Sequence, residues 1–202
     1  MILRTLIFCL LAGAGAACST GFPAPLRAAL PEVPDQRLFS EAVLIATNNA
    51  RCHAGRPALY HAEPLRKAAF IHSRNMVATS TFSHRTKITS ASTLKKRVAL
   101  ANLRYRLVAE NLALLSRFQF GSGQPFSVED RAACKFRNPL NGQVIPPHSY
   151  KTLAEETVRQ WMGSPGHKKN LLSKRLARLG ASAIFAPTNT CGQFYITQVF
   201  AD

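Results

Sequence analysis

Acidic residues are scarce in this sequence. Only 10 Asp and Glu oppose 26 Lys and Arg among 202 residues, so the formal net charge is +16. A surface this basic favours polyanionic partners such as anionic lipid, an acidic cell-wall polymer or nucleic acid. A basic surface that serves only solubility is the alternative. The five cysteines form no CxxC pair and no Cys/His cluster with zinc-finger spacing, so disulfides are favoured over thiolate-bound zinc.

Long apolar runs are also missing. The run Leu6–Leu11 is too short to span a membrane. It follows Arg4 and precedes small residues at 12–17, which is the pattern of a secretory signal peptide. Residues 1–17 are therefore predicted to be a signal peptide that is absent from the folded domain. Export argues against a nucleic-acid partner, and no recognised nucleic-acid motif occurs.

Two cleavage patterns compete at the end of this signal peptide. Ala14-Gly15-Ala16 satisfies the small-x-small rule for ordinary cleavage, which would yield a periplasmic or secreted protein. Residues 15–18 resemble a bacterial lipobox with Cys18 as the acylated residue, although Gly15 stands where a branched apolar residue is usual. We favour a lipoprotein that reaches the outer or cell membrane only through its lipid anchor. Residues 18–34, with four prolines, are then predicted to be a flexible tether.

Three further cysteines remain if Cys18 carries lipid. Cys52, Cys134 and Cys191 allow one disulfide and one leftover thiol, and the sequence does not choose the pair. Residues 116–150 are broken by glycines and prolines into a long irregular insertion, which is uncommon in a compact domain unless it is functional or tied down. Because Cys134 lies within this insertion, a disulfide is predicted to hold it.

Helices are predicted in the first half of the domain. Asp35 can cap a helix that runs to about Ala50, and Pro64 opens a second one. His72 lies on the apolar face of the second helix and is interpreted as a hydrogen-bonded core histidine.

A basic run and a single acid follow these helices. Lys95-Lys96-Arg97 is interpreted as the solvated face of a short helix. Glu110 is the one acid in the apolar run 107–115. Burying its carboxylate would be costly unless a cation, a metal or hydrogen-bond donors meet it.

The stretch Trp161–Leu172 is the most informative part of the sequence. Gly163 is suited to end one helix, Ser164 to cap the next and Pro165 to start it. His167 then lies in the first turn, where the helix dipole disfavours imidazolium and keeps the ring ready as an acceptor, base or metal ligand. A nucleophile–base pair of Ser164 and His167 is disfavoured, because the serine hydroxyl is expected to cap the His167 N–H. A cap followed by a surface histidine is the simpler alternative.

Two strands are predicted near the end of the chain. Arg178–Phe185 and Phe194–Phe200 flank a turn that contains Pro187. Helices followed by a terminal hairpin indicate an α+β domain in which helices cover an antiparallel sheet.

Seven short motifs occur in an order that resembles a known family. They are Asn48-x-x-Arg51 with Gly55 and Leu59, His72-Ser73-x-x-Met76, Phe82-Ser83-His84, Ala109-Glu110-Asn111-Leu112-Ala113, Trp161-x-x-Ser164-Pro165-Gly166-His167, Leu179-Gly180-Ala181 and Tyr195-x-Thr197-Gln198-Val199-Phe200. Together they resemble the CAP superfamily of cysteine-rich secretory proteins, antigen five and plant pathogenesis-related proteins, and most closely its bacterial SCP-domain branch. The resemblance covers residues 35–202.

The resemblance implies an α-β-α sandwich with a small antiparallel sheet between helical layers. It also implies a cleft that gathers two histidines and two acids. By motif these positions fall on His84, Glu110 and His167, while Ser164 stands where the second acid belongs. Family members that resemble the full set bind a divalent metal, often zinc. His84, Glu110 and His167 would be a three-ligand zinc set, and hydrogen bonding to a water is the alternative.

The resemblance leaves enzyme status open. The favoured hypothesis is a ligand-binding module of the envelope, in which the cleft of His84, Glu110, Ser164 and His167 holds a ligand. The basic surface would contact anionic lipid or a cell-wall polymer, and an apolar small ligand is consistent with the lipid binders of the family. The alternative is a metal-assisted hydrolase, either a peptidase or a wall-modifying enzyme, in which Glu110 is the catalytic general base.

Overall fold

The computed structural model describes residue 18 and residues 21–121, 123–188 and 191–202. The predicted signal peptide, residues 1–17, lies outside the described residues. Among the described residues, no helix has both the length and the apolar character needed to cross a bilayer. The elements in chain order are η1 (Ala24–Arg27), α1 (Gln36–His53), β1 (Tyr60–His61), α2 (Glu63–Ala78), η2 (Thr89–Ala91), α3 (Leu94–Leu100), β2 (Val108–Ser116), β3 (Ser127–Asp130), β4 (Lys135–Arg137), α4 (Tyr150–Gly163), α5 (Pro165–Leu171), β5 (Arg178–Ala186) and β6 (Gln193–Ala201).

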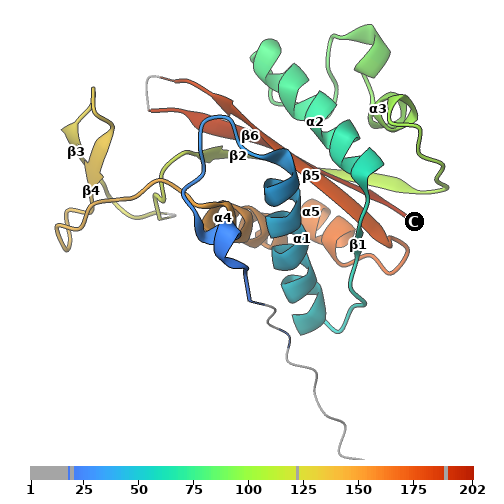
Figure 1. Ribbon diagram of the computed structural model, residues 1–202, viewed down its shortest axis with the longest axis horizontal. Coiled ribbons are helices and arrows are strands. Elements are labelled where there is room, and N and C mark those ends of the chain that lie inside the picture. Colours follow the sequence, from blue (N-terminus) through green and yellow to red (C-terminus); the bar gives the residue numbers. More distant parts are fainter. Residues whose placement is uncertain (1–17, 19–20, 122, 189–190) are drawn as a thin grey trace, which may run out of the picture.

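A four-stranded sheet, ordered β1-β5-β6-β2, forms the centre of the domain (Figure 1). β6 pairs antiparallel with both β5 and β2, and the short strand β1 adds a parallel edge to β5. β5 and β6 match the two predicted strands to within one residue at each end. Along β6, Phe194, Ile196 and Phe200 belong to one core cluster, whereas Val199 belongs to another on the opposite face. This alternation lets one strand support two separate cores.

Helices cover both faces of the sheet (Figure 1). On one face α2 packs on β5 and β6 and is joined by α3, while on the other α1 packs on β5 and α4. The predicted α-β-α sandwich is therefore confirmed. Gly180 on β5 allows α2 to approach closely, because a Cβ added there would lie 2.1 Å from the backbone nitrogen of Arg66.

The helix starts follow their sequence signals. The Asp35 carboxylate accepts hydrogen bonds from two backbone N–H groups in the first turn of α1. Pro64 lies in the first turn of α2, and Pro165 starts α5 directly after Ser164. These are positions where the missing N–H of proline costs no helical hydrogen bond.

Residues 21–34, the described part of the predicted tether at 18–34 apart from Cys18, are not flexible as their composition predicts. Phe22, Leu26 and Leu30 are only 6%, 1% and 3% exposed, and all three belong to the larger core cluster. The Leu30 N–H also donates to the carbonyl of His148 over 2.8 Å. The prediction relied on the prolines and overlooked apolar residues at every fourth position, whose burial offsets the entropy lost when the segment is ordered.

Cys18 forms a disulfide with Cys52 in the last turn of α1, with a Cα–Cα distance of 5.3 Å. One sulfur atom cannot both form a disulfide and carry a thioether-linked lipid, so the structure contradicts the predicted lipidation of Cys18. The prediction of one bridge and a leftover thiol fails for the same reason. All four cysteines among the described residues are paired.

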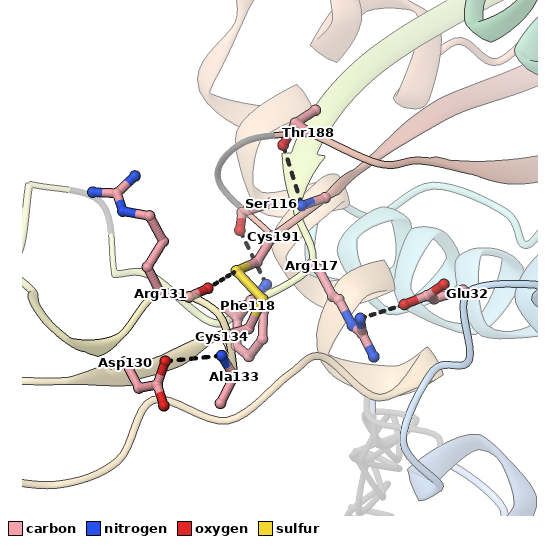
Figure 2. The surroundings of a disulfide bond; sticks show 11 residues. Glu32, Ser116, Arg117, Phe118, Asp130, Arg131, Ala133, Cys134, Thr188 and Cys191 are labelled. Atoms are coloured by element: carbon pink, nitrogen blue, oxygen red, sulfur yellow. Dashed lines mark hydrogen bonds and ion pairs between the residues drawn. A yellow bond between two sulfur atoms is a disulfide. The ribbon is translucent and has the colours of Figure 1, made fainter.

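The insertion at residues 116–150 contains a two-stranded hairpin, β3–β4, that projects from the sandwich (Figure 1). The predicted disulfide that holds the insertion is confirmed. Cys134 is bonded to Cys191, which lies between β5 and β6 (Figure 2). The two cysteines are 57 positions apart, and only the folded arrangement of hairpin and sheet selects this pair.

Candidate functional site

Glu110 lies on β2, at the edge of the sheet, opposite Val199 of β6. The residue is only 7% exposed. Side chains from α2 and α3 reach its carboxylate: His72 Nε2 lies 3.7 Å and Arg97 Nη2 lies 2.6 Å from the nearer oxygen. From the sequence, a cation, a metal or hydrogen-bond donors are the possible partners of a buried Glu110. The structure supplies a cation, the Arg97 side chain.

Both oxygens of the Glu110 carboxylate are engaged. His84 Nδ1 lies 2.9 Å from Oε1, and Arg97 Nη2 donates to Oε2. Burial alone would raise the pKa of Glu110, but the hydrogen bond with His84, the nearby His72 ring and the Arg97 guanidinium hold the pKa below its ordinary value. Glu110 is therefore a carboxylate at neutral pH with little tendency to act as a general base.

Arg97 corrects the interpretation of the basic run on α3. Lys95 and Lys96 are exposed as predicted, but Arg97 is 0% exposed. Its guanidinium donates to Glu110 and to the carbonyl of Ala91 over 3.0 Å. Position 97 lies one turn after Leu94 and beside the buried Val98, so its helical position together with the unpaired acid could have identified it.

His72 is a fourth member of the cluster that the sequence placed only in the core. It is 0% exposed, and neither ring nitrogen makes a hydrogen bond of ordinary geometry in the part of the chain that the structure describes. The predicted core position is therefore confirmed, while the predicted hydrogen bond is reduced to a weak interaction with the Ser83 backbone. Burial lowers the pKa of His72 to about 4, and the attraction of Glu110 only partly opposes this. The ring is neutral at pH 7.

His84 and His167 form the accessible side of the site. The His84 side chain is 58% exposed, and because a carboxylate can only accept, its Nδ1 carries the proton donated to Glu110. His167 is half-buried on α5, and its pKa is lowered first by burial and then by the charge of His84. Asn111 Nδ2 donates to the His167 carbonyl over 3.3 Å, which joins the start of α5 to β2. The lowered pKa that the sequence indicated is present, although burial is its main cause.

Ser164 precedes α5 as predicted, but its hydroxyl makes no side-chain capping hydrogen bond. The expectation that this hydroxyl caps the His167 N–H is therefore wrong. Within the described residues, no hydrogen bond joins the Ser164 hydroxyl to the His167 ring, and the geometry gives no support to a nucleophile–base pair.

The residues present do not fit a bound metal ion. Ser164 replaces the second acid, and Glu110 has committed both oxygens to His84 and Arg97. The Arg97 guanidinium holds a permanent positive charge 2.6 Å from the carboxylate, where it would repel a divalent cation. Across the described ranges, no group of three or more His, Cys, Asp or Glu is arranged to hold a metal. The zinc set of His84, Glu110 and His167 has no support from this geometry.

The sandwich and the histidine–glutamate–histidine set at its sheet edge define a domain of the CAP type. A comparison with known protein families matches residues 44–200 to the cysteine-rich secretory protein family, CAP. The chain belongs to this family, which confirms the resemblance seen in its motifs. A search of curated proteins found no match.

Two solved structures have a similar fold. An extracellular SCP-domain protein from Bacillus anthracis is 21% identical, with a TM-score of 0.55 over 82% of this chain and 41% of that one. An outer surface protein from Borrelia burgdorferi is 15% identical, with a TM-score of 0.50 over 82% of this chain and 90% of that one. The chain thus spans well under half of the Bacillus protein. At these identities the likeness concerns the fold.

Proposed function

We propose that this protein is an exported, non-catalytic module of the bacterial cell envelope that binds an anionic ligand. The observation that carries this proposal is the buried pair of Glu110 and Arg97. The pair cancels the one acidic charge of the site within the protein, which leaves the carboxylate unavailable as a general base or a metal ligand. The family, whose description is secretory, and the likeness to an extracellular and an outer surface protein support the envelope location.

The groups that remain at the site favour anions over cations. His84 presents a largely exposed ring, and His167 is half-buried nearby. Each ring can donate an N–H, and among the described residues of the site no free acid would repel an anion. The chain as a whole carries a formal charge of +16, which concentrates anions around it. A phosphate or carboxylate group, from anionic lipid or from an acidic wall polymer, is the chemistry that suits these donors.

The hydrolase alternative receives no support from the site. A general base works best with a pKa near the working pH, whereas the hydrogen bond with His84 and the neighbouring charges hold the pKa of Glu110 below its ordinary value despite burial. The nearest cation to Glu110 is Arg97, whose guanidinium cannot bind and activate a water as a metal does.

Sedimentation with two probes tests the proposal. Vesicles of phosphatidylglycerol represent the anionic lipid, and sacculi that carry phosphate-rich polymer represent the wall. We expect binding to at least one probe and none to phosphatidylcholine vesicles. The double variant His84→Ala/His167→Ala should bind about tenfold more weakly, a loss of about 1.4 kcal/mol.

The matched control is Lys168→Ala/Lys169→Ala, which removes two exposed cations from the same helix as His167. This control should weaken binding less than the histidine variant, because exposed charges are screened by salt. Equal binding by wild type and the histidine variant would show that general surface charge, and no specific site, holds the ligand. That outcome, or no binding to either probe, would contradict the proposal.

A further inference from the structure

The insertion at residues 116–150 has no part in the site described above. A disulfide and several backbone hydrogen bonds hold its described residues in place. Cys134–Cys191 ties its hairpin to the sheet (Figure 2). The Gln119 N–H donates to the Pro146 carbonyl over 3.0 Å, and the Ile145 N–H donates to the Phe136 carbonyl over 2.9 Å. Segments from three parts of the insertion are thus held side by side, which preorganises any surface they share.

These segments enclose a cavity of about 170 Å³, here called the insertion pocket. Among the described residues, no charged side chain lines it, although the chain carries 26 Lys and Arg. A pocket without charge on so basic a protein is poorly suited to an anion or a cation. Its volume lies below the roughly 300–1,000 Å³ of sites that take drug-sized molecules, which suits a single small ring.

Four primary amides line the insertion pocket: Gln119, Gln124, Asn138 and Gln143. An amide has one acceptor oxygen and two donor hydrogens, which is the pairing that a hydroxyl group needs. Asn138 Oδ1 already accepts from the Leu140 N–H over 2.9 Å and Gln143 Oε1 from Asn141 Nδ2 over 3.4 Å, so these two residues offer chiefly their N–H donors. Gln119 uses its Nε2 to donate to the Pro147 carbonyl over 2.9 Å, which fixes its orientation. The Gln124 backbone N–H donates to the Gly121 carbonyl over 3.0 Å, whereas its side-chain amide makes no hydrogen bond among the described residues and is available to a ligand.

An aromatic platform completes the lining. The rings of Phe120 and Phe126 lie 4.5 Å apart, and Phe120 packs edge-on against Phe136 at 5.0 Å. Phe136 is 5% exposed and anchors the group, whereas Phe126 remains 50% exposed at the pocket. A half-exposed ring on a buried aromatic base presents a rigid apolar face beside the amides.

We propose that the insertion pocket is a second binding site, and that it takes one ring of an uncharged saccharide. The C–H face of a sugar ring would lie on Phe126, and its hydroxyl or acetamido groups would bond the glutamine and asparagine amides. This inference deepens the proposed function, since it adds a contact with envelope glycan, but it uses none of the residues of the Glu110 site.

Calorimetric titration of the oxidised full protein tests this site, with the tetramers of N-acetylglucosamine and of glucose as probes. We expect at least one to bind, with an affinity that salt leaves unchanged because the probes are uncharged. Phe126→Ala should weaken that binding about tenfold or more. Gln143→Leu should also weaken it, because it keeps the side-chain volume and removes the amide.

Leu140→Ala is the matched control, since Leu140 is 77% exposed on the same insertion and does not line the pocket. It should bind as wild type does. His84→Ala/His167→Ala should also leave saccharide binding unchanged, so failure of the proposed anionic site and failure of this one are separable. No binding of either tetramer, or equal binding by wild type, Phe126→Ala and Gln143→Leu, would overturn the inference.

Discussion

Arg97→Met is expected to lower the free energy of unfolding by about 3–5 kcal/mol. Arg97 is 0% exposed and its guanidinium donates to Glu110 over 2.6 Å. Methionine keeps an unbranched apolar stem but leaves the Glu110 carboxylate buried with only the contacts of His84 and His72. Urea unfolding of the oxidised protein, followed by circular dichroism, measures the change. Lys95→Met, an exposed lysine on the same helix, should stay within about 0.5 kcal/mol of wild type.

A double variant separates loss of the pair from loss of packing. Arg97→Met/Glu110→Leu replaces both charges with apolar groups, so no buried charge is left without a partner. We expect it to recover most of the stability that Arg97→Met loses, with an interaction energy of about 2 kcal/mol or more between the two positions. If Arg97→Met costs no more than Lys95→Met, the internal pair does not hold the site together.

Lowering the pH from 7 to 4.5 is expected to destabilise the fold by several kcal/mol. Burial lowers the pKa of His72 and of His148 to about 4, from an ordinary value of 6.5. Between these values the unfolded chain binds more protons than the folded one, so stability falls as the pH falls. The free energy of unfolding keeps its full value above pH 6.5, where both histidines are neutral in the folded and the unfolded chain, and it falls progressively towards pH 4. Each histidine accounts for about 2 kcal/mol by pH 4.5.

His72→Leu should remove about half of this pH dependence. Because neither ring nitrogen of His72 makes a hydrogen bond of ordinary geometry among the described residues, stability at pH 7 should change little. The matched control is His53→Leu, which alters an exposed histidine and should keep the full slope. Unfolding curves collected at several pH values between 4.5 and 7 measure it. If the free energy of unfolding falls with pH equally steeply in wild type and His72→Leu, His72 is not a source of the acid sensitivity.

The parts of the fold that depend on neighbouring residues could be predicted from the sequence. Asp35, Pro64 and Pro165 mark helix starts because capping and proline geometry act within one turn. The alternation that predicts β6 reflects a strand buried on both faces by different helices. The positions of His84, Glu110 and His167 came from family motifs, and the structure brings them to one edge of the sheet.

The parts that depend on distant residues could not be predicted. The place of Arg97 one turn after Leu94 is a local sign of burial, but only the fold brings Glu110, 13 positions later, to its guanidinium. The sequence placed His72 on a buried face, but only the packing of α2 on the sheet brings it within 3.7 Å of Glu110. Cys18 lies in a stretch that resembles a lipidation pattern, and only the fold brings it to Cys52, 34 positions away.

The central claim is that Arg97 is the counter-ion of Glu110 and that the site therefore binds anions. A zinc titration is its most direct test. Zinc is titrated into the oxidised protein at pH 7, and calorimetry measures the heat of binding. The protein is purified without an affinity metal. We expect no stoichiometric binding in wild type. Binding of about one zinc per chain, lost in Glu110→Gln and in His84→Ala while both variants stay folded, would contradict the claim and restore the metal-assisted hydrolase.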